Sequence, residues 1–187
     1  MTEKLSERAA IFIDGSNFYH SVKDTLDVHD NEVDFRKLIE ELKRGRLLIS
    51  VYYYNASLDR SYNEEIYWKQ QKFFSELRGI PGFHVILCHM RKILKAGKEP
   101  EFKVKGDDIH LATDMLSMAY EHLYDTAILV SGDGDFVPLV RKIRKLDKKV
   151  ENAYFLISCS NFLKKECDFS ILLDEVITEK CLKQSKD

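Results

Sequence analysis

Short apolar segments alternate along this chain with segments of helical periodicity, and this alternation limits the fold more than any other feature. The apolar segments are rich in β-branched and aromatic residues, which predicts buried strands. They cover residues 9–13, 46–54, 82–88, 126–130 and 149–157. Helical spacing of apolar residues covers residues 34–45, 61–82, 107–124 and 135–146. The alternation predicts a mostly parallel sheet with helices on both faces.

The composition is that of a globular protein. A chain of 187 residues, 44% hydrophobic and 32% charged, is long enough to bury one sizeable core. No apolar run approaches the roughly 18–20 residues that cross a bilayer, and MTEKLSERAA at the N-terminus lacks the apolar stretch of a signal peptide. The four cysteines form no C-x-x-C pair, so reduced thiols are expected. We therefore expect a cytoplasmic protein with no membrane partner.

Acidic residues follow two of the predicted strands. Asp14 comes directly after the first strand, in DGSNF, and Asp133 and Asp135 follow the strand at 126–130, in SGDGDF. In parallel α/β sheets ligands bind at the carboxyl ends of the strands. Each acid also has an ordinary explanation, because Asp, Ser and Asn are the preferred N-caps of helices. Ser16 or Asn17 would then cap the first helix. Asp133 or Asp135 would cap the later one, and Asp135 stands nearer that helix.

A third group of acids lies on a predicted helix, in KGDDIHLATDML. On a helical wheel Asp108 points toward the middle of the apolar face and Asp114 lies near its edge. A carboxylate on an inward face needs compensation of its charge, although Asp108 is also explained as an exposed residue of a first turn. If the strands at 9–13 and 126–130 are neighbours, the acids converge. Carboxylates at such a distance raise one another's pKa unless a cation neutralises them. Oxygen ligands suit Mg²⁺ or Mn²⁺.

Three motifs, in this order, resemble one known family: AIFIDGSNFYHSV, KGDDIHLATDML and AILVSGDGDFVPLVRKIRKLDKKVENAYF. They are similar to those of the NYN domain family, in the LabA-like (DUF88) branch of the PIN-like nuclease superfamily. The resemblance runs from about residue 8 to about residue 174. It implies a single NYN domain over residues 1–187, with a C-terminal tail at 175–187. The implied fold is a Rossmann-like three-layer α/β/α sandwich with a mostly parallel central sheet.

The resemblance also implies the site residues. The matching positions are Asp14, Asn17, Asp108, Asp114, Ser131, Asp133 and Asp135. One position departs from the pattern, because Asp107 stands where the family usually has an apolar residue. The helical wheel favours Asp108 over Asp107 as the acid that faces the metal.

We expect each residue to have a distinct role. Asp14, Asp108 and Asp133 would be metal ligands, while Asp114 and Asp135 would complete the ligand set or orient water. Asn17 and Ser131 would bind the phosphate or a ligand carboxylate. Lys103 and Lys105 lie in residues 91–105, a basic segment expected to form a hairpin or loop beside the site. These two lysines would steer the RNA backbone, or they belong to a solvated charged loop.

Two other groups of residues have an ordinary structural explanation. Tyr52, Tyr53, Tyr54 and Phe18 could stack on unpaired bases, but strand aromatics more often fill the core. Residues 141–149 carry six bases and one acid, and a helix that covers a sheet needs such a polar outer face.

The expected function is that of a metal-dependent ribonuclease, an endoribonuclease by the resemblance, which hydrolyses phosphodiester bonds of single-stranded or structured RNA with Mg²⁺ or Mn²⁺. The alternative is a non-catalytic RNA-binding or regulatory module on the same fold. A phosphatase with a nucleophilic aspartate fits less well, because such enzymes usually carry a second Asp where this chain has Ser16. The sequence leaves open whether the protein forms a homodimer.

Overall fold

A computed structural model describes residues 6–61, 63–93 and 101–183, with the backbone alone for residues 91–93 and 101–105. The strands are β1 (Arg8–Asp14), β2 (Leu47–Ala56), β3 (Phe83–Ile93), β4 (Glu101–Lys105), β5 (Thr126–Val130), β6 (Lys149–Tyr154) and β7 (Phe169–Leu172). The helices are α1 (Gly15–Leu26), α2 (Phe35–Lys43), α3 (Glu64–Arg78), α4 (Asp107–Tyr120), α5 (Val137–Arg144), α6 (Asn161–Glu166) and α7 (Leu173–Val176). Short 3₁₀ turns are η1 (Asp30–Glu32), η2 (Gly134–Phe136) and η3 (Leu156–Ser158), and a π-helix, η4, spans Ile177–Cys181.

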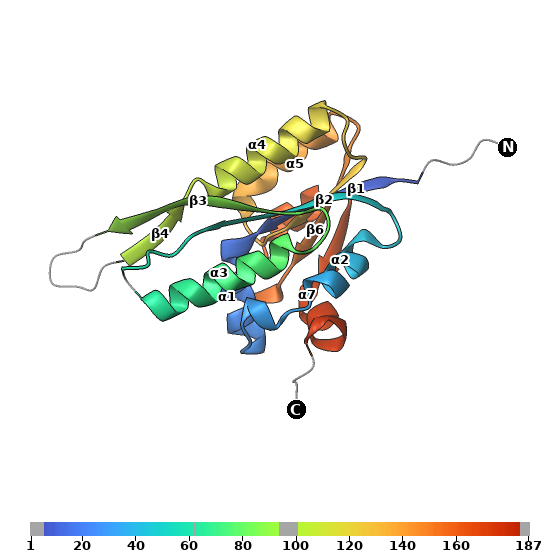
Figure 1. Ribbon diagram of the computed structural model, residues 1–187. Helices are drawn as coiled ribbons and strands as arrows, with labels where there is room; N and C mark the ends of the chain where they lie inside the picture. The colour runs from blue at the N-terminus through green and yellow to red at the C-terminus, as the bar shows by residue number, and fades with distance from the viewer. Residues whose placement is uncertain (1–5, 62, 94–100, 184–187) are drawn as a thin grey trace.

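The strands form one sheet in the order β4-β3-β2-β1-β5-β6-β7. All neighbouring pairs are parallel except β3 with β4, which form an antiparallel pair that projects beyond the rest of the sheet (Figure 1). From β1 the chain adds β2, β3 and β4 toward one edge of the sheet, and from β5 it adds β6 and β7 toward the other edge. The boundary between β1 and β5 is therefore the switch point at which such sheets bind ligands. The predicted mostly parallel sheet is confirmed, and so is the assumed pairing of β1, which ends at Asp14, with β5, which precedes the loop that carries Asp133.

Helices cover both faces of the sheet, with α4 and α5 on one side and α1, α2 and α3 on the other (Figure 1). Each face has its own apolar cluster. Successive side chains of β1 enter opposite clusters, Ile11 and Ile13 on one face and Phe12 on the other, because strand side chains alternate between faces. The expected three-layer α/β/α sandwich is confirmed.

The aromatic residues of β2 and α1 lie mainly in these cores. Tyr53 and Phe18 are buried in one cluster and Tyr54 in the other, while Tyr52 is half-buried and stacks on Phe12. The described structure therefore supports the packing explanation for these side chains rather than base stacking.

Several element ends differ from the predicted ones. The helix predicted to reach residue 124 ends at Tyr120, because His122 takes a left-handed backbone conformation with φ of 54°. The strand predicted to reach residue 157 ends at Tyr154 and passes into η3. The hairpin or loop expected at 91–105 is the β3–β4 pair, and residues 94–100 lie outside the described part.

The sequence predicts a tail from residue 175, but the described part of this segment packs against the domain. Ile177 and Cys181 are buried in the same core as α2. The backbone N–H of Asp34 donates to the carbonyl of Cys181 over 2.6 Å, and Val33 forms a β-bridge with Leu182. Residues 175–183 thus belong to the folded unit.

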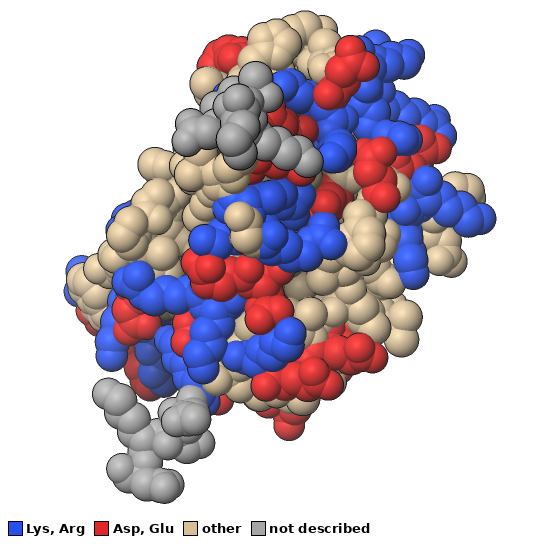
Figure 2. Space-filling view, turned by 90° about the vertical axis from the view of Figure 1, so that its right-hand side faces the viewer, with Lys and Arg blue, Asp and Glu red and all other residues tan. Residues whose placement is uncertain are grey.

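Basic and acidic side chains alternate on the face formed by the amino ends of the strands (Figure 2). Arg46 and Arg44 both bind Glu151, and Arg141 and Arg144 of α5 bind the acids Glu166 and Asp168. The basic cluster at residues 141–149 therefore forms a polar, largely ion-paired outer face. Among the described helices, none is long and apolar enough to span a membrane.

The ion pair between Arg8 and Asp125 predicts a pH-dependent contribution to stability. Both the backbone N–H and the guanidinium of Arg8 donate to the Asp125 carboxylate, and these hydrogen bonds lower its pKa from 3.8 to about 2. A lowered pKa stabilises the fold above about pH 4, and the contribution is lost as the pH falls toward 2. Both side chains remain partly exposed, which limits the effect to about 1 kcal/mol or less.

We expect Asp125→Asn to lower the free energy of unfolding at pH 7 and to have little effect near pH 2. Urea denaturation at several pH values measures this difference. Asp24→Asn, at an exposed position of α1, is the matched control. An effect of Asp125→Asn that stays constant with pH would contradict the prediction.

Candidate metal centre

Asp14 ends β1 at the switch point and is only 5% exposed. Its Oδ1 accepts a hydrogen bond from the backbone N–H of Asn17 over 3.0 Å, so Asp14 itself is the N-cap of α1. The prediction that Ser16 or Asn17 caps this helix was wrong, because the helix already begins at Gly15. A Cβ at Gly15 would lie 2.6 Å from the Tyr53 ring and from the Tyr54 carbonyl oxygen. Glycine is needed here for close approach, and this brings α1 tightly onto β2.

Ser131 links Asp14 to the SGDGDF loop that follows β5. Its hydroxyl donates to Asp14 Oδ2 over 3.0 Å and accepts from the Asp133 backbone N–H over 3.1 Å. Asp133 in turn accepts from the Asp135 backbone N–H over 2.9 Å and caps η2. The sequence offers Asp133 and Asp135 as caps, and the structure shows that Asp133 is the cap of η2. Ser131 bonds a carboxylate, which is one of the two roles expected of it.

Asn17 fastens the same loop to α1. Its side-chain oxygen accepts from the backbone N–H of Gly132 over 3.1 Å and lies 3.5 Å from the Ser158 hydroxyl. A Cβ at Gly132 would lie 2.0 Å from the carbonyl oxygen of Ser158, so no side chain fits at this position. Asn17 thus holds two loops at the carboxyl edge of the sheet in place.

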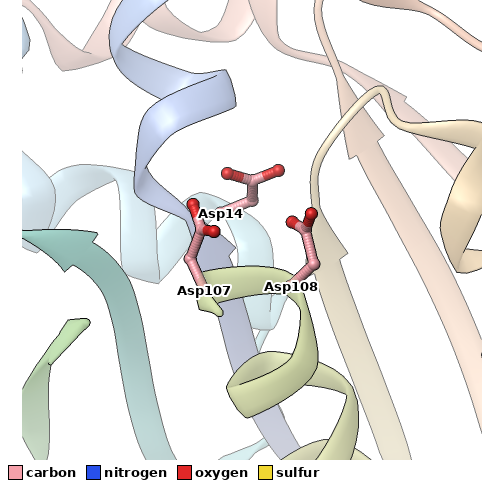
Figure 3. A group of neighbouring side chains, drawn as sticks. All are labelled: Asp14, Asp107 and Asp108. Atoms are coloured by element: carbon pink, nitrogen blue, oxygen red, sulfur yellow. The ribbon is translucent and has the colours of Figure 1, made fainter. Parts of the chain in front are cut away.

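Three carboxylates converge at this edge (Figure 3). Asp14, Asp107 and Asp108 each offer one oxygen, and these oxygens lie within 4.8 Å of one another. Asp107 and Asp108 are the first two residues of α4, and side chains at a helix start point back beyond its N-terminus. Asp107 is half-buried and Asp108 exposed. The sequence favours Asp108 alone, whereas the structure turns both acids toward Asp14.

The other predicted acids surround this group without joining it. Asp114 lies further along α4 and accepts a hydrogen bond from the Tyr54 hydroxyl over 3.0 Å. Burial, and then the charge of Asp114, raises the pKa of Tyr54, so this hydroxyl stays protonated as a donor. Asp133 and Asp135 are close enough for their charges to affect Asp108. Lys103 and Lys105 lie on β4, but their side chains are outside the described part.

The converging acids repel one another. Burial, followed by the charges of Asp108 and Asp107, raises the pKa of Asp14 from 3.8 to about 7, against the opposing hydrogen bonds from Asn17 and Ser131. Burial, and then the charges of Asp107, Asp133 and Asp135, raises the pKa of Asp108. Full ionisation near neutral pH therefore requires a neighbouring cation.

The donor set fits a hard divalent cation. All three side chains of the group offer carboxylate oxygens, the ligands preferred by Mg²⁺ and Mn²⁺, whereas zinc sites usually include His or Cys. Cys88 lies near these acids, but burial and the charges of Asp107, Asp108 and Asp114 raise its pKa to about 11. At neutral pH it is therefore a protonated thiol and a poor ligand.

The family model of the NYN domain matches residues 8–174, which is almost the whole length of the chain. The chain belongs to the NYN domain family. NYN domains have a nuclease-like fold, and the acidic cluster described above lies within the matched region.

A solved structure shares this fold. It is the crystal structure of VPA0982, a protein of unknown function from Vibrio parahaemolyticus RIMD 2210633, with 26% sequence identity and a TM-score of 0.74. The similarity covers 95% of this chain and 99% of that one. Among curated proteins none matches this chain.

The pKa of Asp14 predicts how the metal-free protein responds to pH. A carboxyl group whose pKa is raised by folding stabilises the protein below its unfolded value, and this contribution is lost as the pH rises through the folded value. In EDTA we expect Asp14→Asn to become more stable relative to wild type as the pH rises from 5 to 8. The shift from 3.8 to about 7 sets an upper limit of about 4 kcal/mol.

Urea denaturation in EDTA at each pH measures this difference. At pH 7.5 we also expect millimolar Mg²⁺ or Mn²⁺ to raise the melting temperature of wild type but not of Asp14→Asn. Asp24→Asn is again the control. A stability difference that does not change with pH would show that Asp14 is already ionised in the folded protein.

Proposed function

We propose that this protein is a metal-dependent endoribonuclease that hydrolyses RNA phosphodiester bonds at the Asp14–Asp107–Asp108 group. The convergence of these three carboxylates at the switch point of the sheet carries the proposal. Mutually repelling acids weaken a fold, and their presence at the ligand-binding edge favours a site for Mg²⁺ or Mn²⁺ over a structural role. RNA is the proposed substrate because NYN domains act on RNA.

A bound Mg²⁺ or Mn²⁺ would supply Lewis-acid chemistry for phosphodiester hydrolysis. The residues of the chain hold the three carboxylates in position. Ser131 and the N-terminus of α1 fix both oxygens of Asp14, and the first turn of α4 presents Asp107 and Asp108 from the other side. We assign to Asp135, which is exposed beside Asp108, the orientation of the water that attacks phosphorus. Asp114 would hold α4 in place through Tyr54. Lys103 and Lys105 would steer the RNA backbone toward the site.

Cleavage assays test the proposal. We expect single-stranded or structured RNA to be cut in Mn²⁺ or Mg²⁺ and to stay intact in EDTA. Asp14→Asn and Asp108→Asn should lower kcat/KM by about 100-fold or more, since even residues that only support metal ligands typically contribute 10–100-fold. Asp24→Asn should retain full activity.

Two other outcomes are informative. RNA that is bound but not cut in either metal, with binding unchanged in both variants, would contradict the nuclease and favour the non-catalytic RNA-binding module. Cleavage that persists in EDTA, or in both variants, would place the activity outside this group of acids.

The geometry and the sequence predict different third ligands. The described carboxylates place Asp107 in the group with Asp14 and Asp108, whereas the third ligand expected from the sequence is Asp133. We expect Asp107→Asn to weaken Mn²⁺ binding about 10-fold or more and Asp133→Asn to weaken it less, as isothermal titration calorimetry would measure. An Asn at position 133 still offers a side-chain oxygen, so Asp133→Asn preserves the cap of η2. The reverse order would restore Asp133 as the ligand.

A further inference from the structure

Three apolar side chains project into solvent at the carboxyl end of β6. Leu156 and Ile157 of η3 are 70% and 60% exposed, and Phe162 of α6 is 79% exposed. We call these three residues the β6 rim. An exposed aromatic residue beside other exposed apolar residues often marks a binding surface. The β6 rim adjoins the carboxyl end of β5, on the side of the acids away from β2.

Hydrogen bonds fasten the β6 rim to the loop that carries Asp133 and Asp135. The backbone N–H of Ser160 donates to the Gly132 carbonyl over 2.9 Å. Close packing continues at Gly134, where a Cβ would lie 2.8 Å from the Ser160 hydroxyl. Since Phe162 follows Ser160 by two residues, its position is fixed relative to the acids.

The preceding segment is held equally firmly. The Ser21 hydroxyl donates to that of Ser158 over 2.8 Å, and the backbone N–H of Leu156 donates to Asp174 over 3.1 Å. These bonds tie η3 to α1 and α7. The exposed side chains of the β6 rim therefore stand on a rigid support, as a preorganised binding surface requires.

Positive charge accompanies the aromatic side chain. Phe162 and Lys165 are three residues apart on α6 and both exposed, so they share one face of the helix. Lys164 lies beside them and donates to the Tyr154 hydroxyl over 2.7 Å. An aromatic ring with a cation on the same face is the combination that binds single-stranded nucleic acid, through base stacking and backbone charge.

We infer that the β6 rim takes an unpaired base of the RNA substrate, with Phe162 stacked on the base and Lys165 facing the backbone. The inference rests on the proposed function, because it requires a phosphodiester at the acids. The β6 rim is fastened to the loop beside the acids, so it is placed to contact the base of a nucleotide next to that phosphate. In a duplex both faces of the base are already stacked, so the site selects single-stranded RNA.

Binding and cleavage are tested separately. Binding of a fluorescent single-stranded octanucleotide is measured by anisotropy in an Asp108→Asn background, in which cleavage is strongly reduced. Phe162→Ala should weaken binding about 5- to 100-fold, as expected for the loss of one stacked base, and Phe162→Trp should restore it. Binding of a duplex of the same sequence should not change with either substitution. The matched control is Phe169→Ala, because Phe169 is also exposed but begins β7, where it packs against Arg44.

An RNA series with one abasic nucleotide at each position identifies the stacked base. With Phe162 present, removal of the base at one position should weaken binding by about the same factor as Phe162→Ala. In Phe162→Ala that removal should have no further effect, because the two changes delete the same contact. The Phe169→Ala protein should behave like the Asp108→Asn parent.

Each contrary result has a distinct meaning. Equal binding by Phe162→Ala and Phe169→Ala, or abasic losses that persist in Phe162→Ala, would overturn the inference while leaving the nuclease intact. A dimer that Phe162→Ala converts to a monomer in analytical ultracentrifugation would show that the β6 rim binds a second copy of the chain, which also overturns it. Wild type that binds RNA through Phe162 but cuts it in neither Mn²⁺ nor Mg²⁺ would refute the proposed function alone.

Discussion

The hydrogen bonds that hold the buried carboxylate of Asp14 organise everything else at this edge of the molecule. Burial of a carboxylate is unfavourable unless hydrogen bonds or opposite charge compensate it. Here one oxygen accepts from the first turn of α1 and the other from Ser131. The first bond fixes where α1 begins, and the second ties β1 to the loop after β5. One side chain therefore sets the helix, the loop and the position of the acids, and its substitution affects all three.

The N-termini of two helices partly offset the repulsion among the acids. Asp14 caps α1, and Asp107 and Asp108 form the start of α4, so two helix N-termini meet at the cluster. The N-terminal end of a helix carries partial positive charge that favours anions, by typically 0.3–1 kcal/mol at exposed positions. This is smaller than the effect of burial on Asp14, whose pKa still rises to about 7. The fold supports the acids without neutralising them, and a cation at their oxygens completes the balance.

The sequence predicted β1, β2, β3, β5, β6 and the longer helices because burial imposes a period on their side chains. It did not predict β7, a short strand at the edge of the sheet whose residues are only partly buried or exposed. It placed Asp14 near Asp108 only through the assumption that the first strand pairs with the strand at 126–130, which the sheet order confirms. The part played by Asp107 was missed because a helical wheel orients residues relative to a helix whose first residue is unknown, and a first-turn side chain can point past the helix end. The cap of α1 was misassigned for the same reason, since Asp14 stands one residue before the helix that it caps. The contact of Tyr54 with Asp114 joins residues 60 positions apart and leaves no local signal.

The distribution of charge decides how such a protein can hold RNA. The chain has a formal net charge of −2, and many of its arginines are paired with acids at the amino ends of the strands, on the face opposite the cluster. Long-range attraction for a polyanion is therefore weak, and affinity has to arise from contacts at the carboxyl edge itself. Tyr53 and Tyr54 are enclosed in the two cores and cannot supply them. Among the exposed aromatic residues of the described chain, Phe162 stands on a helix fastened directly to the SGDGDF loop. A site of this kind gains affinity from stacking rather than from net charge, so its preference for unpaired RNA follows from the same arrangement that leaves the rest of the surface nearly neutral.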